Sequence, residues 1–223
     1  MYERALSFLN KLDSLGFVGY IVGGYPRDKY LGFENSDIDI CTNMKPNELK
    51  EHFDVIESFD KYGSVRIKYE DSVLEVTTFR KDGTYKDFRR PDSVEFVDTL
   101  EEDIKRRDFV INTLCIDKDG NYIDLLGARK DIDNKIIRVV GNIEKKLTED
   151  PLRIIRALRF SVMLNFELEE ELNTCIIKNG NLIEKVPKYA INKELRHLNN
   201  EKKQEFYDIL LEYGIYDSEF DIF

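Results

Sequence analysis

The sequence predicts an α+β protein, with a small mixed sheet and flanking helices in the N-terminal half and helices alone after it. Short apolar runs bounded by glycine or proline dominate the first half, whereas helical spacing of apolar residues dominates from about residue 99 onward. With 223 residues, 42% of them hydrophobic, the chain is long enough to bury a core without disulfides or metal ions. We expect a first domain over residues 1–140 and a helical second domain over residues 141–223.

The elements of the first domain follow from apolar spacing and from the residues that interrupt it. Apolar residues recur at helical spacing over residues 2–15, and Gly16 ends that helix. Pro26 and Pro46 each suit the first turn of a further short helix. The runs that predict strands are 18–22, 36–42, 54–58, 64–69, 73–80 and 94–97.

The polar, turn-rich stretch 81–93 predicts a long loop, and loops of that length are usually functional or mobile. Beyond it, a hairpin is predicted around Asp119-Gly120 and a strand over residues 136–140. The helices predicted for the rest of the chain are 99–114, 142–147, 150–164, 168–179, 188–198 and 201–213.

Composition and charge exclude several classes of protein. A net charge of −10 argues against a surface coated for nucleic acid, although a local basic cleft remains possible. No apolar run approaches the ~18 residues that a membrane span needs, and the N-terminus lacks a signal-peptide pattern, so we expect a cytoplasmic protein. Three widely spaced cysteines predict neither a disulfide framework nor a structural zinc site. The two histidines, His52 and His197, disfavour histidine-cluster mechanisms, including hydrolases built on a His-Asp pair.

Two acidic residues, Asp37 and Asp39, alternate with Ile38 and Ile40 on the strand predicted over 36–42. Residues i and i+2 of a strand point to the same face, so the carboxylates are expected to lie together while the isoleucines enter the core. Such like charges are tolerable only beside a cation, and Mg²⁺ binds carboxylate and phosphate oxygens together. Alone, the pair is weak evidence for a metal site, and a solvated strand face is the favoured interpretation.

A glycine pair, Gly23-Gly24, follows a predicted buried strand and precedes the helix at Pro26. Glycine lets the backbone approach a phosphate closely, and the N–H groups at the helix start would face the same anion. Arg27 can reach a phosphate from the first helical turn. The alternative is an ordinary strand-to-helix turn that needs glycine conformations.

A third carboxylate is expected on a neighbouring strand, where Glu75 lies in a β-rich run; an edge-strand glutamate is an equal alternative. In the second half, four charged residues recur every three positions, beginning directly before the helix start at Pro151. They share one broad face of the helix, and taken alone this pattern favours a solvated amphipathic face. These residues are Asp150, Arg153, Arg156 and Arg159.

Taken together, these residues resemble the tRNA nucleotidyltransferase and poly(A) polymerase family of the bacterial type. These are the class II CCA-adding enzymes, within the polymerase-β-like nucleotidyltransferases. The likeness extends over about residues 17–166 and more weakly to about 195. Its stretches, in the family's order, are VGGYPRDKYLG, SDIDICT, EVTTFR, DFRRPDSVEFVDTLEEDIKRRDFVINTL, YIDLLGARKDI, IIRVVG, EDPLRIIRALRFSVMLNF and NLIEKVPKYAINKEL.

The resemblance implies a polymerase-β-like catalytic head over residues 1–140 and a helical neck over residues 141–223. The sequence ends at Phe223, before the body and tail domains with which family members continue. The loop 81–93 matches the family's flexible loop, which is linked to the switch from C to A addition.

The resemblance also implies roles for individual residues. Asp37 and Asp39 would bind catalytic Mg²⁺, with Mn²⁺ as a possible substitute, and Glu75 would be the third carboxylate. The implied nucleotide-binding residues are Gly23, Gly24, Arg27 and Arg107 toward the nucleotide and its phosphates, Asp150 and Arg153 toward the Watson–Crick edge of the base, and Arg156 and Arg159 lining the same pocket.

The implied reaction transfers CMP or AMP from CTP or ATP to the 3′-hydroxyl of an RNA, with tRNA as the expected acceptor and pyrophosphate as the product. A CC-only, A-only or poly(A)-adding enzyme of the same family is an alternative. Another is an inactive RNA- or nucleotide-binding module that needs a partner chain. No membrane partner is expected, and the sequence leaves the oligomeric state open.

Overall fold

A computed structural model describes residues 1–85, 88, 91–215, 217, 220 and 222. The chain forms two compact units. The first consists of Met1–Gly83 and Ser93–Lys130, and the second of Thr84–Asp92 and Asp131–Phe223. The first unit contains a mixed sheet with flanking helices and the second is mainly helical, so the predicted α+β class is confirmed.

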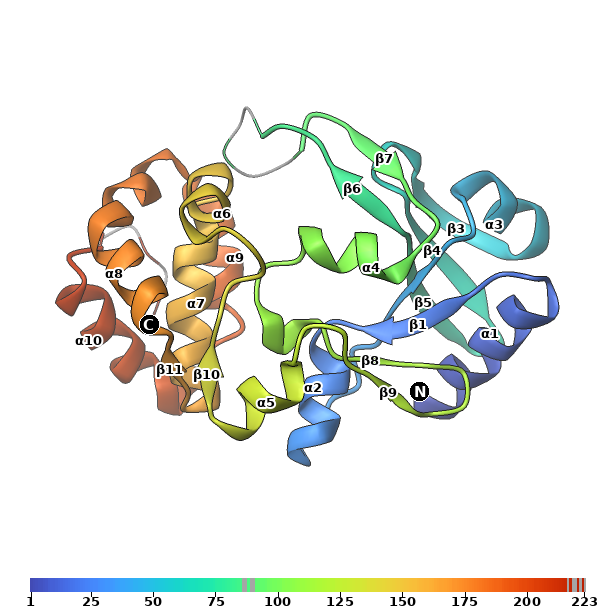
Figure 1. Cartoon of the computed structure of the whole chain (residues 1–223), viewed down its shortest axis with the longest axis horizontal. Helices are drawn as coiled ribbons and strands as arrows, with labels where there is room; N and C mark the ends of the chain where they lie inside the picture. The colour runs from blue at the N-terminus through green and yellow to red at the C-terminus, as the bar shows by residue number, and fades with distance from the viewer. Residues whose placement is uncertain (86–87, 89–90, 216, 218–219, 221, 223) are drawn as a thin grey trace. The chain divides into compact units, whose positions relative to one another are not determined.

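A seven-stranded sheet forms the centre of the first unit, in the order β3-β4-β5-β2-β1-β8-β9 (Figure 1). Strands β2 and β5 pair in parallel, whereas the other neighbours in this sheet pair antiparallel. The strands are β1 (Gly19–Val22), β2 (Asp39–Thr42), β3 (Asp54–Phe59), β4 (Ser64–Tyr69), β5 (Ser72–Thr78), β8 (Cys115–Ile116) and β9 (Tyr122–Ile123). A separate hairpin joins β6 (Arg80–Asp82) to β7 (Val94–Phe96).

One face of this sheet carries the main hydrophobic core. Helix α1 (Tyr2–Ser14) contributes the buried side chains Phe8, Leu9 and Leu12, and α3 (Pro46–His52) contributes Leu49. These side chains pack with the inward residues of β2, β4 and β5, which are Ile40, Val65, Ile67, Leu74 and Val76. Alternation along the strands therefore turns Asp39 and Glu75 to the opposite face.

The opposite face has a smaller core around β1, β2 and β8. Val22, Cys41 and Cys115 pack there with Leu100 of α4 (Leu100–Asp103) and with Ile104. The completely buried carboxylate of Asp103 fixes this segment to β6, because it accepts hydrogen bonds from Arg106 and Arg107 and from the backbone N–H of Arg80. Burial alone would raise the pKa of Asp103, but the charges of the two arginines and these hydrogen bonds hold that pKa below its ordinary value.

The single helix predicted over 99–114 is wrong. The chain forms α4, a 3₁₀ turn η2 (Ile104–Arg106) and a second 3₁₀ turn η3 (Val110–Asn112), with an extended backbone at Arg107. Consecutive buried residues from Phe109 to Ile111 cannot all share one helix face. The break at Arg107 lets this apolar run enter the core while Arg107 stays beside Asp103.

Other elements also differ from their predicted bounds. Strand β2 begins at Asp39 rather than at residue 36, and helix α2 (Gly24–Leu31) begins two residues before Pro26. Helix α5 (Ala128–Asp133) and strand β11 (Glu167–Leu168), which pairs in parallel with β10 (Ile136–Ile137), were not predicted. Within the predicted loop 81–93, residues 81 and 82 belong to β6, and residues 86, 87, 89 and 90 lie outside the described part of the chain.

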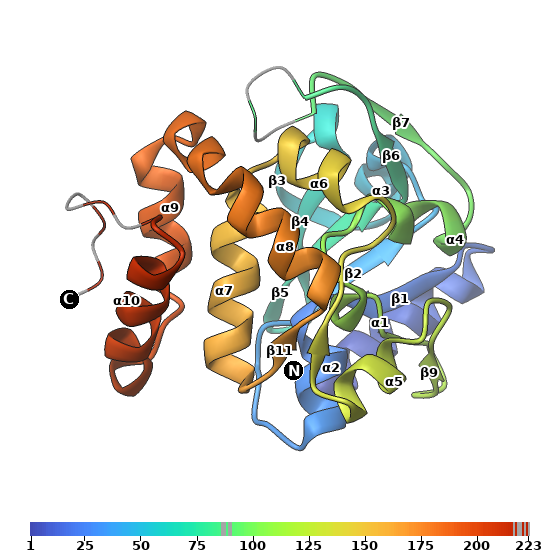
Figure 2. The ribbon, with the colours of Figure 1, turned by 60° about the vertical axis from the view of Figure 1, so that its left-hand side comes forward.

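The second unit is built around helix α7, which packs against α9 and α10 and also contacts α6 (Figure 2). Asn165 adopts a left-handed conformation and ends α7. The helices are α6 (Ile143–Glu149), α7 (Leu152–Leu164), α8 (Glu170–Asn179), α9 (Lys188–Leu195) and α10 (Lys203–Glu212), with 3₁₀ turns η4 (Gly180–Lys185) and η5 (Asn200–Lys202); a further 3₁₀ turn, η1 (Asp60–Tyr62), belongs to the first unit. In the described residues, no helix has both the length and the apolar character to cross a membrane.

Replacing Asp103 with alanine removes the carboxylate that Arg106 and Arg107 share and leaves buried positive charge. We expect the free energy of unfolding to fall by about 3–5 kcal/mol, measured by urea denaturation at pH 7. The control Asp98→Ala, at an exposed carboxylate nearby in the chain, is expected to cost less than about 0.5 kcal/mol. Equal effects of the two substitutions would contradict the anchoring role of Asp103.

Candidate active site

The turn between β1 and α2 brings the backbone close to a carboxylate. Gly23 caps α2 with φ +80° and ψ −139°, a conformation that is essentially restricted to glycine. A Cβ atom built on Gly23 would lie 3.1 Å from Asp39 Oδ2, because Val22 is the strand partner of Asp39. The first glycine of the pair is therefore required both by its backbone conformation and by its approach to Asp39.

Asp39 lies directly beside Glu75, since the two residues are partners in the parallel pairing of β2 with β5. Asp37 does not belong to the strand, so the prediction that both aspartates alternate along one strand is wrong. Asp37 is exposed in the segment that precedes β2, and its negative charge nevertheless acts on Asp39. Strand pairing thus places Glu75 beside Asp39, and the loop keeps Asp37 near enough for its charge to act on Asp39.

Burial, together with the negative charges of Asp37 and Glu75, raises the pKa of Asp39 to about 6, against a smaller opposing effect of Arg107. Glu75 itself is exposed and lies 3.8 Å from Arg66 on β4. Asp39 is therefore the carboxylate whose ionised form is disfavoured, by its burial and by the charges of its two acidic neighbours.

This donor set fits a divalent cation of the Mg²⁺ type. Such ions take carboxylate oxygens, and a cation beside Asp39 would favour the ionised carboxylate, which burial and the charges of Asp37 and Glu75 disfavour. Among the described residues, no three His, Cys, Asp or Glu side chains are gathered closely enough to form a ready-made metal centre. The residues able to hold the ion are Asp37 and Asp39, with Glu75 beside Asp39 on the neighbouring strand β5.

A buried arginine lies at the start of α2. The Arg27 guanidinium pairs with Asp28, with Nη2 2.7 Å from Asp28 Oδ1, and its Nη1 donates to Asn112 Oδ1 at 2.7 Å. A Cβ atom on Gly24 would lie 3.3 Å from Arg27 Nη2, so the glycine leaves space beside the guanidinium. Arg27 and the first N–H groups of α2 form a positive end to the segment that begins next to Asp39.

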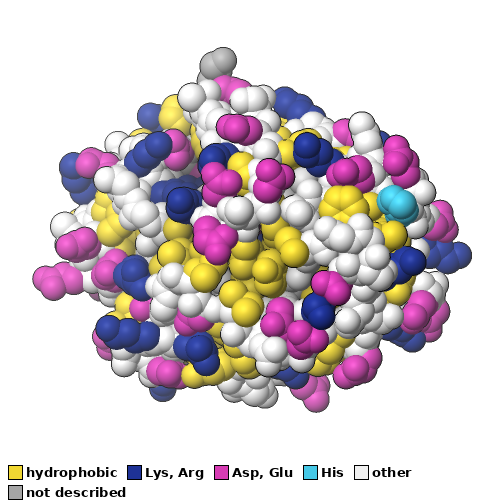
Figure 3. All heavy atoms as spheres, turned by 45° about the vertical axis from the view of Figure 1, so that its right-hand side comes forward, with side chains coloured by type: hydrophobic (Ala, Val, Ile, Leu, Met, Phe, Trp, Pro, Cys, Tyr) yellow, Lys and Arg dark blue, Asp and Glu magenta, His cyan; other side chains and the backbone are white. Residues whose placement is uncertain are grey.

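Arg107 belongs to the same environment. Its Nη2 donates to Asp103 Oδ2 at 2.9 Å, and its charge acts on Asp39 by lowering the pKa of that carboxyl. Gly23, Glu75 and the charges of Asp37 and Arg107 thus act at Asp39, and Arg27 lies beside Gly24. On the face shown in Figure 3, acidic and basic side chains are interspersed and form no continuous basic patch.

The arginines of α7 do not form a solvated face, so that interpretation is wrong. Arg153 and Arg159 are buried, and Arg156 is partly buried. Arg156 Nη1 lies 3.0 Å from Glu194 Oε1 and Arg159 Nη2 lies 3.2 Å from Glu194 Oε2, so this glutamate of α9 balances both charges. Phe160 lies beneath both guanidinium groups.

Asp150 and Arg153 are also neighbours. Arg153 Nε lies 3.7 Å from Asp150 Oδ2, and Arg153 Nη1 donates to the carbonyl oxygen of Lys146 at 3.0 Å. The ring of Tyr85 lies 5.9 Å from the Arg153 guanidinium carbon. Asp150 separates α6 from α7, so its position is set by the break between these helices.

Four residues that support the predicted site were missed in the sequence: Asp28, Asn35, Asn112 and Glu194. Asp28 adjoins Arg27 directly. Asn112 and Glu194, which also bind buried arginines, lie in the stretches VINTL and NKEL that resemble the family. A search for an acidic or amide partner for each buried arginine would have found these three. Asn35 carries no comparable signal, because it lies in a segment without regular structure.

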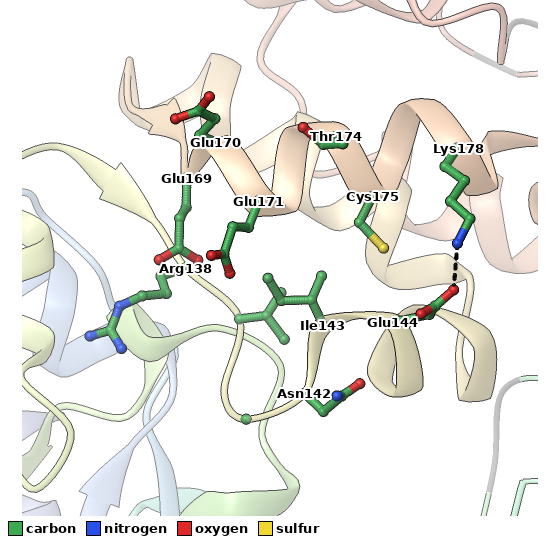
Figure 4. Close-up of a pocket in the computed structure, with 12 residues that line it drawn as sticks. Arg138, Asn142, Ile143, Glu144, Glu169, Glu170, Glu171, Thr174, Cys175 and Lys178 are labelled. Carbon is green, nitrogen blue, oxygen red and sulfur yellow. Dashed lines mark hydrogen bonds and ion pairs between the residues drawn. The ribbon is translucent and has the colours of Figure 1, made fainter.

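The helical unit also contains a cavity of about 980 Å³ between α6 and α8 (Figure 4). Glu169, Glu171 and Arg138 line it, and Lys178 pairs with Glu144 at its rim. Burial raises the pKa of Glu169, and the charge of Glu171 adds to this effect. The described residues that line the cavity include none of the predicted site residues.

Because ionised Asp39 is disfavoured by its surroundings, Asp39→Asn is expected to stabilise the metal-free protein at pH 7.5, by about 1–2 kcal/mol in urea unfolding. Because the pKa of Asp39 is raised, the stability that its protonated form contributes to the wild-type protein is fully present below about pH 3.8. This contribution is lost as the pH rises through about 6. The difference between variant and wild type should therefore vanish near pH 4. The exposed control Asp54→Asn should show no such gain. A variant that is less stable than wild type at pH 7.5 would contradict the repulsion.

Comparisons with known proteins identify relatives of the chain. The chain is 43% identical over 213 residues to the CCA-adding enzyme of Ligilactobacillus salivarius (strain UCC118), a match that covers 93% of this chain and 53% of that protein. The crystal structure of the Bacillus stearothermophilus CCA-adding enzyme in complex with CTP matches with a TM-score of 0.87 and 34% identity, over 98% of this chain and 53% of the other. A tRNA nucleotidyltransferase complexed with a primer tRNA and an incoming ATP analog matches with a TM-score of 0.74 and 27% identity, over 95% of this chain and 62% of the other.

The chain spans about half the length of the curated relatives that it matches. The family model of the poly A polymerase head domain matches residues 19–138. Because this match extends over more than half of the chain and includes both carboxylate-bearing strands, β2 and β5, the chain belongs to the poly A polymerase head domain family.

Proposed function

We propose that the chain transfers CMP or AMP from CTP or ATP to the 3′ end of an RNA, with tRNA as the acceptor, and releases pyrophosphate. The observation that carries this proposal is the placement of Asp39 beside Glu75 and within contact distance of Gly23, where its pKa is raised to about 6. The relatives, which are CCA-adding enzymes and a tRNA nucleotidyltransferase, support the same reaction.

Asp37 and Asp39 would hold divalent ions, with Glu75 as the third carboxylate. Bound Mg²⁺ or Mn²⁺ would lower the pKa of the attacking hydroxyl and offset negative charge on the leaving pyrophosphate, as in a two-metal mechanism. The ionised form of Asp39 is the binding form, so affinity for the ion rises with pH through about 6. No histidine takes part as a general base in this scheme.

The triphosphate would bind at the start of α2. Gly23 and Gly24 let it approach the backbone, and the N–H groups of the first helical turn face it. Arg27 adds a fixed positive charge, because Asp28 and Asn112 hold its guanidinium in one orientation. This arrangement compensates the negative charge that shifts toward the leaving pyrophosphate in the transition state.

Base selection is assigned to the second unit. Arg153 offers hydrogen-bond donors and Asp150 offers an acceptor, a combination that cytosine and adenine can satisfy through their Watson–Crick edges. Arg156 and Arg159 would line the same nucleotide pocket, held by their shared partner Glu194. Protein side chains thus take the part of a template.

The activity test compares wild type with Asp39→Asn, using labelled CTP and ATP and a tRNA that lacks its 3′ CCA end. We expect incorporation to fall by at least about a thousandfold, because amide oxygen is a poor substitute for the carboxylate that holds the ion. The variant keeps the shape of the side chain and is expected to be more stable, so unfolding does not explain the loss. Exposed Asp54→Asn on the same sheet is the control. Normal turnover by Asp39→Asn would refute the assignment, and sequencing the product ends distinguishes CCA, CC, A and poly(A) addition.

The base-selection test uses Arg153→Lys, which keeps the positive charge but loses the fork of donors. We expect the preference for CTP and ATP over GTP and UTP, measured as a ratio of kcat/KM values, to fall by about tenfold or more. The KM for CTP should change less than this ratio. An unchanged profile across the four nucleotides would contradict the protein-template role of Arg153.

A further inference from the structure

The segment between α2 and β2 must place Asp37 without the help of a strand. Helix α2 ends at Leu31, and β2 begins only at Asp39, so Asp37 lies outside any ladder of strand hydrogen bonds. Its carboxylate is exposed and is repelled by the nearby charge of Asp39. A local interaction is therefore needed to keep Asp37 at the site.

The side chain of Asn35 provides that interaction. Its Oδ1 accepts a hydrogen bond from the backbone N–H of Asp37 at 2.8 Å, and its Nδ2 donates to Asp28 Oδ2 at 2.7 Å. The amide orientation is determined, because the opposite one would place Oδ1 against a carboxylate and Nδ2 against an N–H group. Asn35 thus links the backbone of Asp37 to the carboxylate of Asp28.

The next hydrogen bond in this series connects Asp28 to Arg27, the residue proposed to bind phosphate. Asp28 uses its other oxygen, Oδ1, to accept from Arg27 Nε at 2.8 Å, and the side chains of Asp28 and Arg27 are 14% and 8% exposed. A hydrogen bond to a carboxylate that is this well buried is stronger than one between exposed neutral groups. The order Arg27–Asp28–Asn35–Asp37 is therefore a continuous bonded path within the first unit.

We propose that Asn35 is a positioning residue that holds the metal-binding residue Asp37 in register with the buried Arg27–Asp28 pair. This inference rests on the proposed function, since it assigns Asn35 a role in forming the metal site of that reaction. Asn35 touches neither nucleotide nor metal in this role; it acts through the backbone of Asp37. The binding of the divalent ion then depends on a residue outside the carboxylate set.

A simpler role for Asn35 is a local Asx turn, in which only the bond to Asp37 matters. Asn35→Ser separates the two roles. The serine hydroxyl can still accept from the N–H two residues on, but the shorter side chain cannot reach Asp28. Ser36→Ala, at an exposed neighbour in the same segment, is the matched control.

The first measurement is Mn²⁺ binding by electron paramagnetic resonance, without nucleotide or turnover. Asp39→Asn defines the binding that belongs to the site. We expect Asn35→Ser to weaken this Asp39-dependent binding by about tenfold, the effect of losing one charge-assisted hydrogen bond. Ser36→Ala should stay within about twofold of wild type. Binding by Asn35→Ser within about twofold of wild type would overturn the positioning role and leave only the turn.

The second measurement determines kcat and the KM for CTP separately during CMP addition. Asn35→Ser is expected to lower kcat by about tenfold at limiting Mn²⁺ with little change in the KM for CTP, because Asp28 and Asn112 still hold Arg27. Raising Mn²⁺ should restore kcat. If excess Mn²⁺ does not restore it, the inference is contradicted. If wild type shows neither Asp39-dependent Mn²⁺ binding nor CMP addition, the proposed function itself is contradicted and the inference falls with it.

Discussion

The parallel pairing of β2 with β5 is the constraint on which the site depends, because it fixes Asp39 beside Glu75 on one face of the sheet. Apolar residues on the other face bind these strands to α1, so the carboxylates cannot separate by a shift of register without exposing the core. The fold therefore keeps Asp39 buried and close to other negative charges, and burial together with these charges raises its pKa. The free energy of burying the apolar face of the sheet offsets the electrostatic repulsion between the carboxylates on the other face.

Positive charge is handled in the opposite way. Each buried arginine described in the two units has a carboxylate within ion-pairing distance: Arg27 has Asp28, Arg153 has Asp150, and Arg159 has Glu194. Burying these ion pairs costs desolvation free energy, so they are not expected to contribute much to the free energy of unfolding. Their value lies in orientation, since a guanidinium fixed on both sides presents its remaining donors in one direction. Excess negative charge near Asp39 and oriented positive charge elsewhere are what a metal- and phosphate-dependent reaction requires.

The sequence was sufficient for the fold class and for most helices and strands, because their apolar periodicity reflects burial directly. It failed where individual side-chain contacts override the local pattern. Asp37 follows the alternation of a strand yet lies in a loop, where its backbone N–H donates to Asn35. The arginines of α7 have amphipathic spacing, yet Arg153 and Arg159 are buried, with Asp150 and Glu194 balancing their charges. The predicted helix over 99–114 is broken because Asp103 and the run beginning at Phe109 are both buried. Partners that are distant in sequence leave no periodic signal.

The central claim is that Asp37 and Asp39 bind one divalent cation next to the glycine pair. The most direct measurement is anomalous X-ray diffraction from crystals of this chain grown with Mn²⁺ and a non-hydrolysable CTP analogue. The account predicts an anomalous peak in contact with carboxylate oxygens of both Asp37 and Asp39, and with phosphate oxygens near the start of α2. Manganese bound elsewhere, or an Asp37 carboxylate turned away from the ion, would contradict it.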